Sequence, residues 1–193
     1  MDVEYLIEGE RAALGPLRRD LAETYTRWIN RLEVKAGILN LGIYDVQSEE
    51  AWLEENAKTN AQLDPTAANF TIYDREDGAP VGTCALMNIS HRHARATFGI
   101  LLGERRGRGL GTDATRLTLD WAFNVLSLRN VILEVHPWNA GAIRAYEKAG
   151  FKLIGRRRDA LVARGRRWDE IYMDAVASEF TGSVLAGRLP AVE

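Results

Sequence analysis

The sequence predicts a single α/β domain, α+β in some classification schemes. Its core would be a central, mixed and partly parallel twisted sheet of about seven strands with helices on both faces. Three observations support this class. The 193 residues are 46% hydrophobic, which is enough to form one well-packed core. Segments rich in β-branched residues alternate with amphipathic segments. In the middle of the chain the order is strand, helix, strand, helix, and such crossovers require parallel neighbours covered by helices.

The first half of the chain contains four predicted strands and two predicted helices. Strands are expected at residues 5–8, 69–74, 81–89 and 95–102, and helices at residues 18–30 and 48–61. Turns between the last three strands are provided by Asp77-Gly78 and by a His/Arg segment. Ser48, followed by two glutamates, is expected to begin the second helix, because small polar and acidic residues stabilise helix N-termini.

The second half continues the alternation. After a glycine-rich turn, one face of a helix is formed by Ala114, Leu117, Trp121, Ala122 and Val125. The remaining elements are a strand at 130–136, a helix at 139–149, and two strands at 151–163 and 167–175 joined by a turn at 164–165. No repeat or linker divides the chain, so residues 1–180 are assigned to one domain and residues 181–193 to a C-terminal tail.

The most informative segment is the glycine-rich turn from Arg106 to Gly111, which lies between a predicted strand and a predicted helix. Glycine lets the main chain turn tightly and approach a ligand closely, so several backbone N–H groups remain free at the positive end of the helix. Arg106 and Arg108 add full positive charges. The segment therefore predicts a site for a polyphosphate.

The spacing of the glycines narrows the choice of polyphosphate. Counted from Gly107, the sixth position is Thr112 rather than glycine, which excludes the dinucleotide fingerprint. No Gly-Lys-Ser/Thr follows, which excludes the nucleotide-triphosphate loop. What remains is Arg-x-x-Gly-x-Gly at Arg106, Gly109 and Gly111. This pattern resembles the pyrophosphate loop of the GNAT N-acetyltransferases, which hold acetyl-CoA.

A second motif resembles the same superfamily. The pattern Asn-x-x-Ala-x-x-x-Tyr-Glu-x-x-Gly-Phe runs from Asn139 to Phe151, directly after a predicted strand. Together with residues 27–30 and 165–173, the two motifs make the chain similar to the Rim-type branch, which includes acetyltransferases of ribosomal-protein N-termini, polyamines and some antibiotics. In such enzymes acetyl-CoA lies in a V-shaped split between the fourth and fifth strands. Here these strands would be residues 95–102 and 130–136.

The resemblance implies a binding site for acetyl-CoA as co-substrate. The residues expected to contact it are Ile100, Leu101, Leu102, Arg106, Gly107, Arg108, Gly109, Leu110, Gly111, Thr112, Asn139 and Ala142. Backbone N–H groups of the strand at 100–102 would stabilise the carbonyl oxygen as it becomes negative. Asn139 has two expected roles, binding of the pantetheine arm and capping of its helix.

Glu134 and Tyr146 are the expected catalytic residues. An amine with a pKa near 10.4 is nucleophilic in only about one molecule in 2500 at neutral pH, a handicap of roughly 4.6 kcal/mol, so a base must accept its proton. Glu134 matches the base of Rim-type relatives, which acts directly or through water; its alternative is a sheet carboxylate paired with an arginine. Tyr146 matches their general acid for the CoA thiolate; its alternative is a core aromatic residue.

Composition and charge argue against several other classes. Cys84 is the only cysteine, which excludes internal disulfides, and its apolar surroundings predict a buried structural thiol. His91 and His93 have a chelating spacing but no third ligand, so no metal site is expected. The arginines lack aromatic interleaving, which argues against nucleic acid. Without a signal peptide or an apolar span of roughly 20 residues, a cytoplasmic protein with no membrane contact is expected.

The acceptor amine remains open at this level. Residues 36–66, with an acidic helix start and the aromatic Tyr44 and Trp52, are expected to overhang the split and select a cationic amine, such as a protein N-terminus, a polyamine or an antibiotic. The alternative is a solvated helix face, which is favoured for Glu54 and Glu55. Direct transfer in a ternary complex is expected, since no cysteine is placed as a nucleophile. The alternatives are a non-catalytic acyl-CoA-binding module and an acyltransferase for a larger donor such as succinyl-CoA. A homodimer is also left open, because many relatives are dimers.

Overall fold

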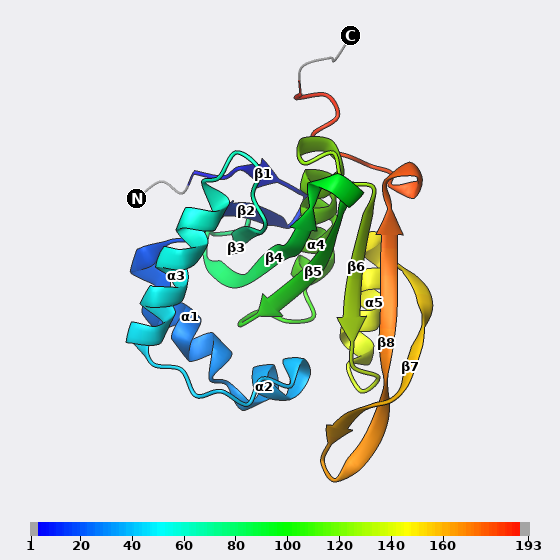
Figure 1. Cartoon of the computed structure of the whole chain (residues 1–193). Helices are drawn as coiled ribbons and strands as arrows, with labels where there is room; N and C mark the ends of the chain where they lie inside the picture. The colour runs from blue at the N-terminus through cyan, green and yellow to red at the C-terminus, as the bar shows by residue number, and fades with distance from the viewer. Residues whose placement is uncertain (1–3, 190–193) are drawn as a thin grey trace.

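The computed structural model describes residues 4–189, which form one mixed sheet of eight strands in the order β1-β2-β3-β4-β5-β6-β8-β7 (Figure 1). The strands are β1 (Ile7–Glu8), β2 (Ala12–Pro16), β3 (Ala68–Asp74), β4 (Pro80–Ser90), β5 (Arg95–Leu102), β6 (Asn130–Val135), β7 (Lys152–Ala163) and β8 (Arg166–Val176). The helices are α1 (Ala22–Ile29), α2 (Leu32–Ile38), α3 (Val46–Asn60), α4 (Leu110–Asp120) and α5 (Ala140–Ala149). The predicted fold class is confirmed.

The sheet contains one parallel pair among its described strands. β5 and β6 run parallel, whereas every other neighbouring pair is antiparallel. α4 follows β5 and precedes β6, so it provides the crossover that a parallel pair needs. A π-helical turn, Trp121–Val125, extends α4 before the chain returns to β6. The predicted strand-helix-strand order therefore marks the place where the sheet changes from antiparallel to parallel.

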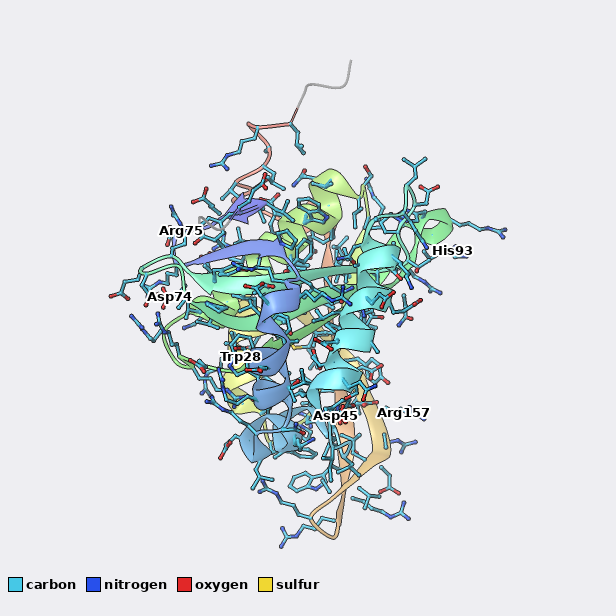
Figure 2. All side chains as sticks on the ribbon, turned by 90° about the vertical axis from the view of Figure 1, so that its left-hand side faces the viewer. Trp28, Asp45, Asp74, Arg75, His93 and Arg157 are labelled. Carbon is cyan, nitrogen blue, oxygen red and sulfur yellow. The ribbon has the colours of Figure 1, made fainter. Side chains whose placement is uncertain are left out.

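Helices cover both faces of the sheet. α4 and α5 lie behind it in Figure 1, where residues such as Leu117 and Leu133 form the main hydrophobic core. α1 packs against α3 over the opposite face, around the buried Trp28 (Figure 2). Side chains alternate along β5, so Leu102 packs against the main core. Leu101 packs against the Trp28 cluster, which consists of Ala22, Tyr25, Trp28 and Leu53. β5 is therefore packed from both sides.

Two elements are absent from the sequence-based prediction. β2 pairs with β1 and β3, although Ala-Ala-Leu-Gly-Pro has a low intrinsic strand preference. Its first three residues are fully buried, so tertiary packing outweighs that preference. α2 is the other: the helix predicted at 18–30 begins as a 3₁₀ turn, continues as α1 and ends at Ile29, and α2 follows after a break.

The start of α3 also needs correction. Asp45, not Ser48, is the N-cap residue. Its carboxylate accepts the N–H of Ser48 at 2.8 Å, and the N–H of Asp45 donates to the Ser48 hydroxyl at 3.1 Å. Ser48 thus closes a capping box from the first turn, which is a role that serine at the third helical position can fill.

Part of the predicted C-terminal tail packs against the domain. The buried Asp120 carboxylate at the end of α4 accepts the N–H of Val184 at 2.6 Å, the N–H of Leu185 at 3.2 Å and the hydroxyl of Ser183 at 2.6 Å. Leu185 is itself buried. Residues 190–193 of that predicted tail lie outside the described residues. Within residues 4–189, the helices are too short or too polar to cross a bilayer.

Candidate active site

The parallel strands β5 and β6 separate after a short paired segment. Arg95 pairs with Asn130, and the last pair is Thr97 with Ile132. β5 nevertheless continues to Leu102 and β6 to Val135. The V-shaped split expected between these two segments is therefore present.

The edge of β5 that faces the split carries backbone donors. Donor direction alternates along a strand. Gly103 donates its N–H to β4, whereas the carbonyl of Ala94 accepts from the start of β6. By this alternation the N–H groups of Ile100 and Leu102 face the split, and that of Leu101 faces β4. Of the three predicted residues, two thus have backbone donors that face the split.

A cavity of about 430 Å³ lies beside the split. Its walls come from α2, the end of β5, the glycine-rich turn with the first turn of α4, and α5. Ten of the predicted cofactor residues line it together with Tyr146: Ile100, Leu101, Leu102, Arg106, Gly107, Gly109, Gly111, Thr112, Asn139 and Ala142. The fold thus brings the two sequence motifs to one cavity.

Three predicted site residues do not line this cavity. Leu110 is 2% exposed and packs into the main core. Glu134 projects from β6, on the opposite side of that strand from the core. The Arg108 guanidinium pairs with Asp74 and Glu76 behind the loop. The expectation that its charge faces the phosphates is corrected, because these carboxylates compete for it.

The glycine-rich turn has the geometry of an anion cradle. Gly107 and Gly109 have φ angles of +84° and +83°, which residues with a Cβ rarely adopt. Gly109 directly precedes α4, so it leads the chain into the helix. The first N–H groups of α4 have no intrahelical partner, and they carry the positive end of the helix dipole. Arg106, whose Nε donates to the Leu102 carbonyl at 3.0 Å, adds a full charge on the cavity side.

Two further cations line the same cavity and were missed by the sequence analysis. Arg144 and Lys148 lie four residues apart on α5, so they share one face of the helix. They supplement Arg106 from the other wall. Their spacing within the second motif is the signal that could have identified them.

Tyr146 lies between the cavity and the core. Its ring makes edge contacts with Phe98 and Phe151, with centroid separations of 6.1 and 6.0 Å. Among the described residues its hydroxyl has no hydrogen-bond partner. Burial raises the pKa of Tyr146 to about 12, so the phenol is protonated at neutral pH.

Asn139 caps α5, as predicted: its side-chain oxygen accepts the N–H of Ala142 at 3.3 Å. The side chain also lines the cavity, opposite Gly37 of α2. Capping uses only the oxygen, so its amide N–H groups remain available to a ligand in the cavity.

Comparison with known proteins identifies the family. A family model described as an acetyltransferase (GNAT) domain matches residues 11–152. The chain belongs to the GNAT acetyltransferase family. It is accordingly an acyltransferase. The glycine-rich turn and the Asn139 helix both lie inside the matched region.

Two curated relatives illustrate the range of acceptors in this GNAT family. Spermidine N(1)-acetyltransferase of Escherichia coli (strain K12) is 31% identical over 139 residues, which cover 71% of this chain and 73% of the relative. A putative ribosomal N-acetyltransferase of Bacillus subtilis (strain 168) is 29% identical over 107 residues, which cover 55% of this chain and 58% of the relative.

Solved structures share the GNAT fold at low sequence identity. A spermidine N-acetyltransferase from Vibrio cholerae in complex with CoA and spermine has a TM-score of 0.75 at 24% identity, covering 88% of this chain and 97% of that one. A ribosomal-protein-S5-alanine acetyltransferase from Vibrio fischeri has a TM-score of 0.77 at 19% identity, covering 91% and 98%. At these identities the likeness shows the fold.

The GNAT split has a second side, formed by β6 and β8. Val131, Leu133 and Val135 turn into the main core, so Glu134 faces the opposite way and is exposed. Its cross-strand neighbour on β8 is Tyr172. We call the surface formed by Glu134, Glu170, Tyr172 and Asp174 the β6–β8 face.

The β6–β8 face is rich in carboxylates. Tyr172 donates its hydroxyl to Glu170 at 2.8 Å, and Asn130 donates to Asp174 at 2.8 Å. Arg157 on β7 lies 3.9 Å from Glu170. No Arg or Lys within residues 4–189 forms an ion pair with Glu134. Within those residues, Glu134 is therefore not the arginine-paired sheet carboxylate that was its alternative role.

An aromatic corner adjoins this face at the end of β6. The rings of His136 and Trp138 lie 4.9 Å apart, and Trp138 meets Trp168 of β8 edge-on at 5.4 Å. Trp138 also donates its indole N–H to the Ala36 carbonyl of α2 at 3.1 Å. His136 is half-buried, and its Nδ1 finds no hydrogen-bond partner among the described residues. Trp138 thus links the segment that follows β6 to α2.

The other candidate residues lie outside the site. Cys84 is buried with its sulfur 3.2 Å from the Thr118 hydroxyl, and burial raises the pKa of its thiol to about 12. The prediction of a buried structural thiol is confirmed. His91 and His93 occupy an exposed turn, where a ring nitrogen of His91 lies 3.0 Å from the Pro65 carbonyl. Within residues 4–189, no cluster of three metal-binding side chains is present.

Proposed function

We propose that this GNAT enzyme transfers an acetyl group from acetyl-CoA to a primary amine of a small cationic molecule, by direct attack in a ternary complex. The observation that carries the proposal is the meeting of the two motifs in one cavity beside the split. The glycine-rich turn would provide N–H groups for a diphosphate. The split would let the thioester meet an amine between β5 and β6.

The residues present fit acetyl-CoA. Arg106, Arg144 and Lys148 would hold its phosphates together with the N–H groups of the loop. Asn139 and the β5 edge would hold the pantetheine arm. When bound, acetyl-CoA supplies an acetyl group activated as a thioester. The β5 N–H groups of Ile100 and Leu102 would then stabilise negative charge on the carbonyl oxygen.

Glu134 would accept the proton of the amine. It lies on β6 in the unpaired part of the split, and it is exposed, so an amine or a bridging water molecule can reach it. Base catalysis would offset part of the roughly 4.6 kcal/mol that separates an ammonium from its free amine at neutral pH.

Tyr146 would act mainly as a hydrogen-bond donor to the departing sulfur. Burial raises the pKa of Tyr146 to about 12, well above the ordinary value of a thiol, so full transfer of its proton to a thiolate would be uphill. A charge-assisted hydrogen bond contributes about 1.5–3 kcal/mol without that cost. Solvent can then protonate the thiolate.

A polyamine is the acceptor that we propose first. Glu134, Glu170 and Asp174 give the β6–β8 face negative charge, and Trp138 and Trp168 beside it offer surfaces for methylene groups and ammonium ions. The relative that is 31% identical is named a spermidine N(1)-acetyltransferase, which supports the same class.

The test is titration calorimetry with acetyl-CoA, followed by CoA release in the presence of spermidine, spermine, an aminoglycoside and a peptide with a free N-terminus. Micromolar binding and fastest release with a polyamine would support the proposal. Release with the peptide alone would overturn the polyamine assignment and keep the N-acetyltransferase. Absence of acetyl-CoA binding would overturn the assignment of the cavity.

A further inference from the structure

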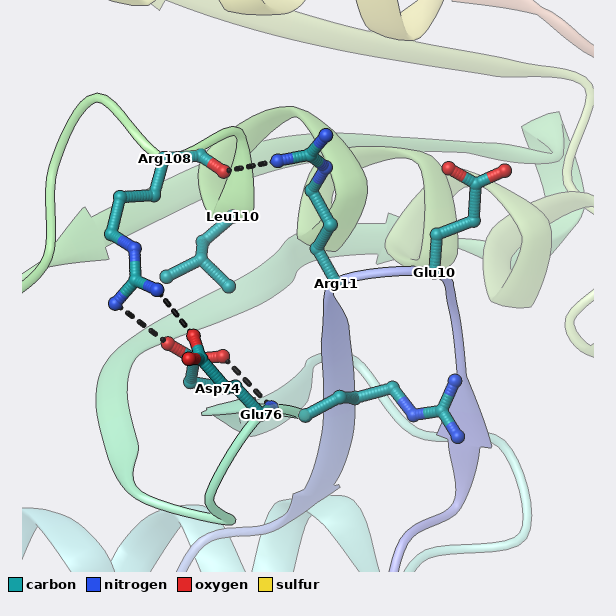
Figure 3. Close-up of a pocket in the computed structure, with 7 residues that line it drawn as sticks. Glu10, Arg11, Asp74, Glu76, Arg108 and Leu110 are labelled. Atoms are coloured by element: carbon teal, nitrogen blue, oxygen red, sulfur yellow. Dashed lines mark hydrogen bonds and ion pairs between the residues drawn. The ribbon is translucent and has the colours of Figure 1, made fainter.

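The glycine-rich turn is held from behind by a cluster of ion pairs that the proposed mechanism does not use. We call this cluster the loop clamp: it consists of Asp74 at the end of β3, Glu76 and Asp77 in the β3–β4 turn, and Arg105 and Arg108 in the loop that contains the glycine-rich turn. Figure 3 shows Arg108 reaching towards Asp74 and Glu76. None of these five residues lines the cavity beside the split.

Asp74 is the centre of the loop clamp. It is 4% exposed at the end of β3, so its charge must be compensated within the protein. Its carboxylate accepts the Arg105 guanidinium at 2.7 Å and lies 3.5 Å from that of Arg108. It also accepts the N–H of Glu76 at 3.0 Å, which fixes the β3–β4 turn.

Arg105 is held by a second carboxylate. Asp77 accepts two hydrogen bonds from it, at 2.8 and 2.7 Å. Arg105 lowers the pKa of Asp77 to about 2 and holds that of Asp74 below its usual range, so both are charged at neutral pH. Arg105 itself has a φ of +52°, which costs free energy for a residue with a Cβ. Its two carboxylate partners offset that cost.

The other end of the loop is fixed as well. Arg11 donates a guanidinium N–H to the Arg108 carbonyl at 3.1 Å. Asp113, in the first turn of α4, accepts the N–H groups of Arg11 and Ala12 at 2.7 and 2.8 Å. The loop is therefore attached to the β1–β2 turn and to the β3–β4 turn, on both sides of its glycines.

These attachments reduce the conformational entropy that the phosphate-binding loop would otherwise lose when a ligand binds. Glycine-rich segments lose more conformational entropy than others when they become ordered, and binding must supply that free energy. A loop that is ordered before binding avoids this loss. The clamp also engages Arg105 and Arg108 with carboxylates and leaves Arg106 as the loop cation that lines the cavity.

We infer that the loop clamp positions the phosphate-binding loop, and that Asp74, Asp77 and Arg105 set the affinity for the diphosphate part of CoA without touching it. The inference rests on the proposed function, since it takes the cavity as the CoA site. It assigns these three side chains to positioning, not to catalysis.

The experiment compares acetyl-CoA with S-acetylpantetheine, which has the same thioester and lacks the diphosphate. D74N and R105K are expected to raise the Kd for acetyl-CoA about tenfold, and D77N, which changes an exposed carboxylate, about threefold. kcat at saturating acetyl-CoA and kcat/KM for S-acetylpantetheine are expected to stay within twofold of the wild-type values. The matched control is D159N, which breaks the Asp159–Arg167 ion pair in the distant β7–β8 hairpin. It should change neither the Kd for acetyl-CoA nor kcat/KM for S-acetylpantetheine.

Two outcomes would overturn the inference. One is an equal loss with both donors, which would indicate general damage to the protein. The other is an unchanged Kd for acetyl-CoA in folded D77N and R105K. These two variants provide the test if D74N does not fold. Amide hydrogen exchange of residues 106–112 gives a reading that needs no ligand: the clamp variants should exchange faster there, and unchanged rates would also overturn the inference. If the wild-type protein does not bind acetyl-CoA, the proposed function fails and hydrogen exchange alone judges the clamp.

Discussion

Replacement of Tyr146 by phenylalanine separates catalysis from binding in this enzyme. The substitution removes one hydroxyl and keeps the ring contacts with Phe98 and Phe151. Because the hydroxyl has no hydrogen-bond partner within the described residues, its loss leaves no protein group unpaired. We therefore expect the melting temperature to stay the same or to rise.

The expected loss of rate follows from the proposed role of the hydroxyl as a hydrogen-bond donor to the departing sulfur. A hydrogen bond from a neutral phenol to a charged sulfur is worth about 1.5–3 kcal/mol, which corresponds to roughly a 10- to 160-fold fall in kcat. The thioester sulfur of bound acetyl-CoA carries little charge and is a weak acceptor, so the Kd for acetyl-CoA should change by less than about twofold.

The assay measures kcat by CoA release and Kd by calorimetry for the same preparations. Tyr25→Phe is the control: Tyr25 is a second buried tyrosine, its hydroxyl lies 2.6 Å from that of Thr71, and it belongs to the Trp28 cluster away from the cavity. It should lose stability and keep its kcat. A fall in kcat of less than threefold for Tyr146→Phe, or a parallel fall in affinity, would refute the assigned role.

Four further predictions concern the base, the α2 contact, the C-terminal segment and pH. Glu134→Gln should lower kcat by about 10²- to 10⁴-fold with unchanged acetyl-CoA affinity, and a pH–rate profile should show recovery towards the pKa of the amine; a profile parallel to wild type would contradict the base role. Trp138→Phe removes the 3.1 Å hydrogen bond to α2, which is worth about 1 kcal/mol. It should therefore raise KM for acetyl-CoA several-fold and leave kcat unchanged. Asp120→Ala leaves the donors of the C-terminal segment without their acceptor and should cost about 2–4 kcal/mol in urea unfolding; an effect below 1 kcal/mol would contradict this. Burial raises the pKa of Tyr25 and of Tyr146 to about 12, from about 10 in the unfolded chain. Since the unfolded state loses these protons first, the free energy of unfolding should fall between pH 10 and 12 by about 3 kcal/mol for each tyrosine, and Tyr146→Phe should remove the part that is due to Tyr146.

The fold class and the two motifs could be predicted because their signals are local. The β-branched run at 130–135 forms β6, and the glycines at 107 and 109 adopt the positive φ angles that a tight turn needs. Asn139 caps α5 by accepting the N–H of Ala142, which lies only three residues later in the sequence. Each of these features depends on neighbours in sequence, so no knowledge of the packing was needed.

Residues whose partners lie far away in sequence were predicted less well. Arg108 was expected to face a phosphate, but Asp74 and Glu76, more than thirty positions earlier, take its guanidinium. Its residue type was consistent with both uses. β2 was missed for a related reason, because burial between β1 and β3 stabilises a segment whose own strand preference is low.

The sequence by itself determined the family resemblance, the glycine-rich turn as a candidate phosphate loop, and the identity of the candidate acid and base. Tertiary structure decided which residues share a cavity: Arg144 and Lys148 join Arg106 only because α5 packs beside α4. It also decided that Glu134 is free of an arginine partner within the described chain and that α2 lines the cavity. Turns, caps and periodicities are set by the conformational preferences of adjacent residues, whereas the distance between two remote side chains is set by how whole elements pack, and one sequence pattern is compatible with many such packings.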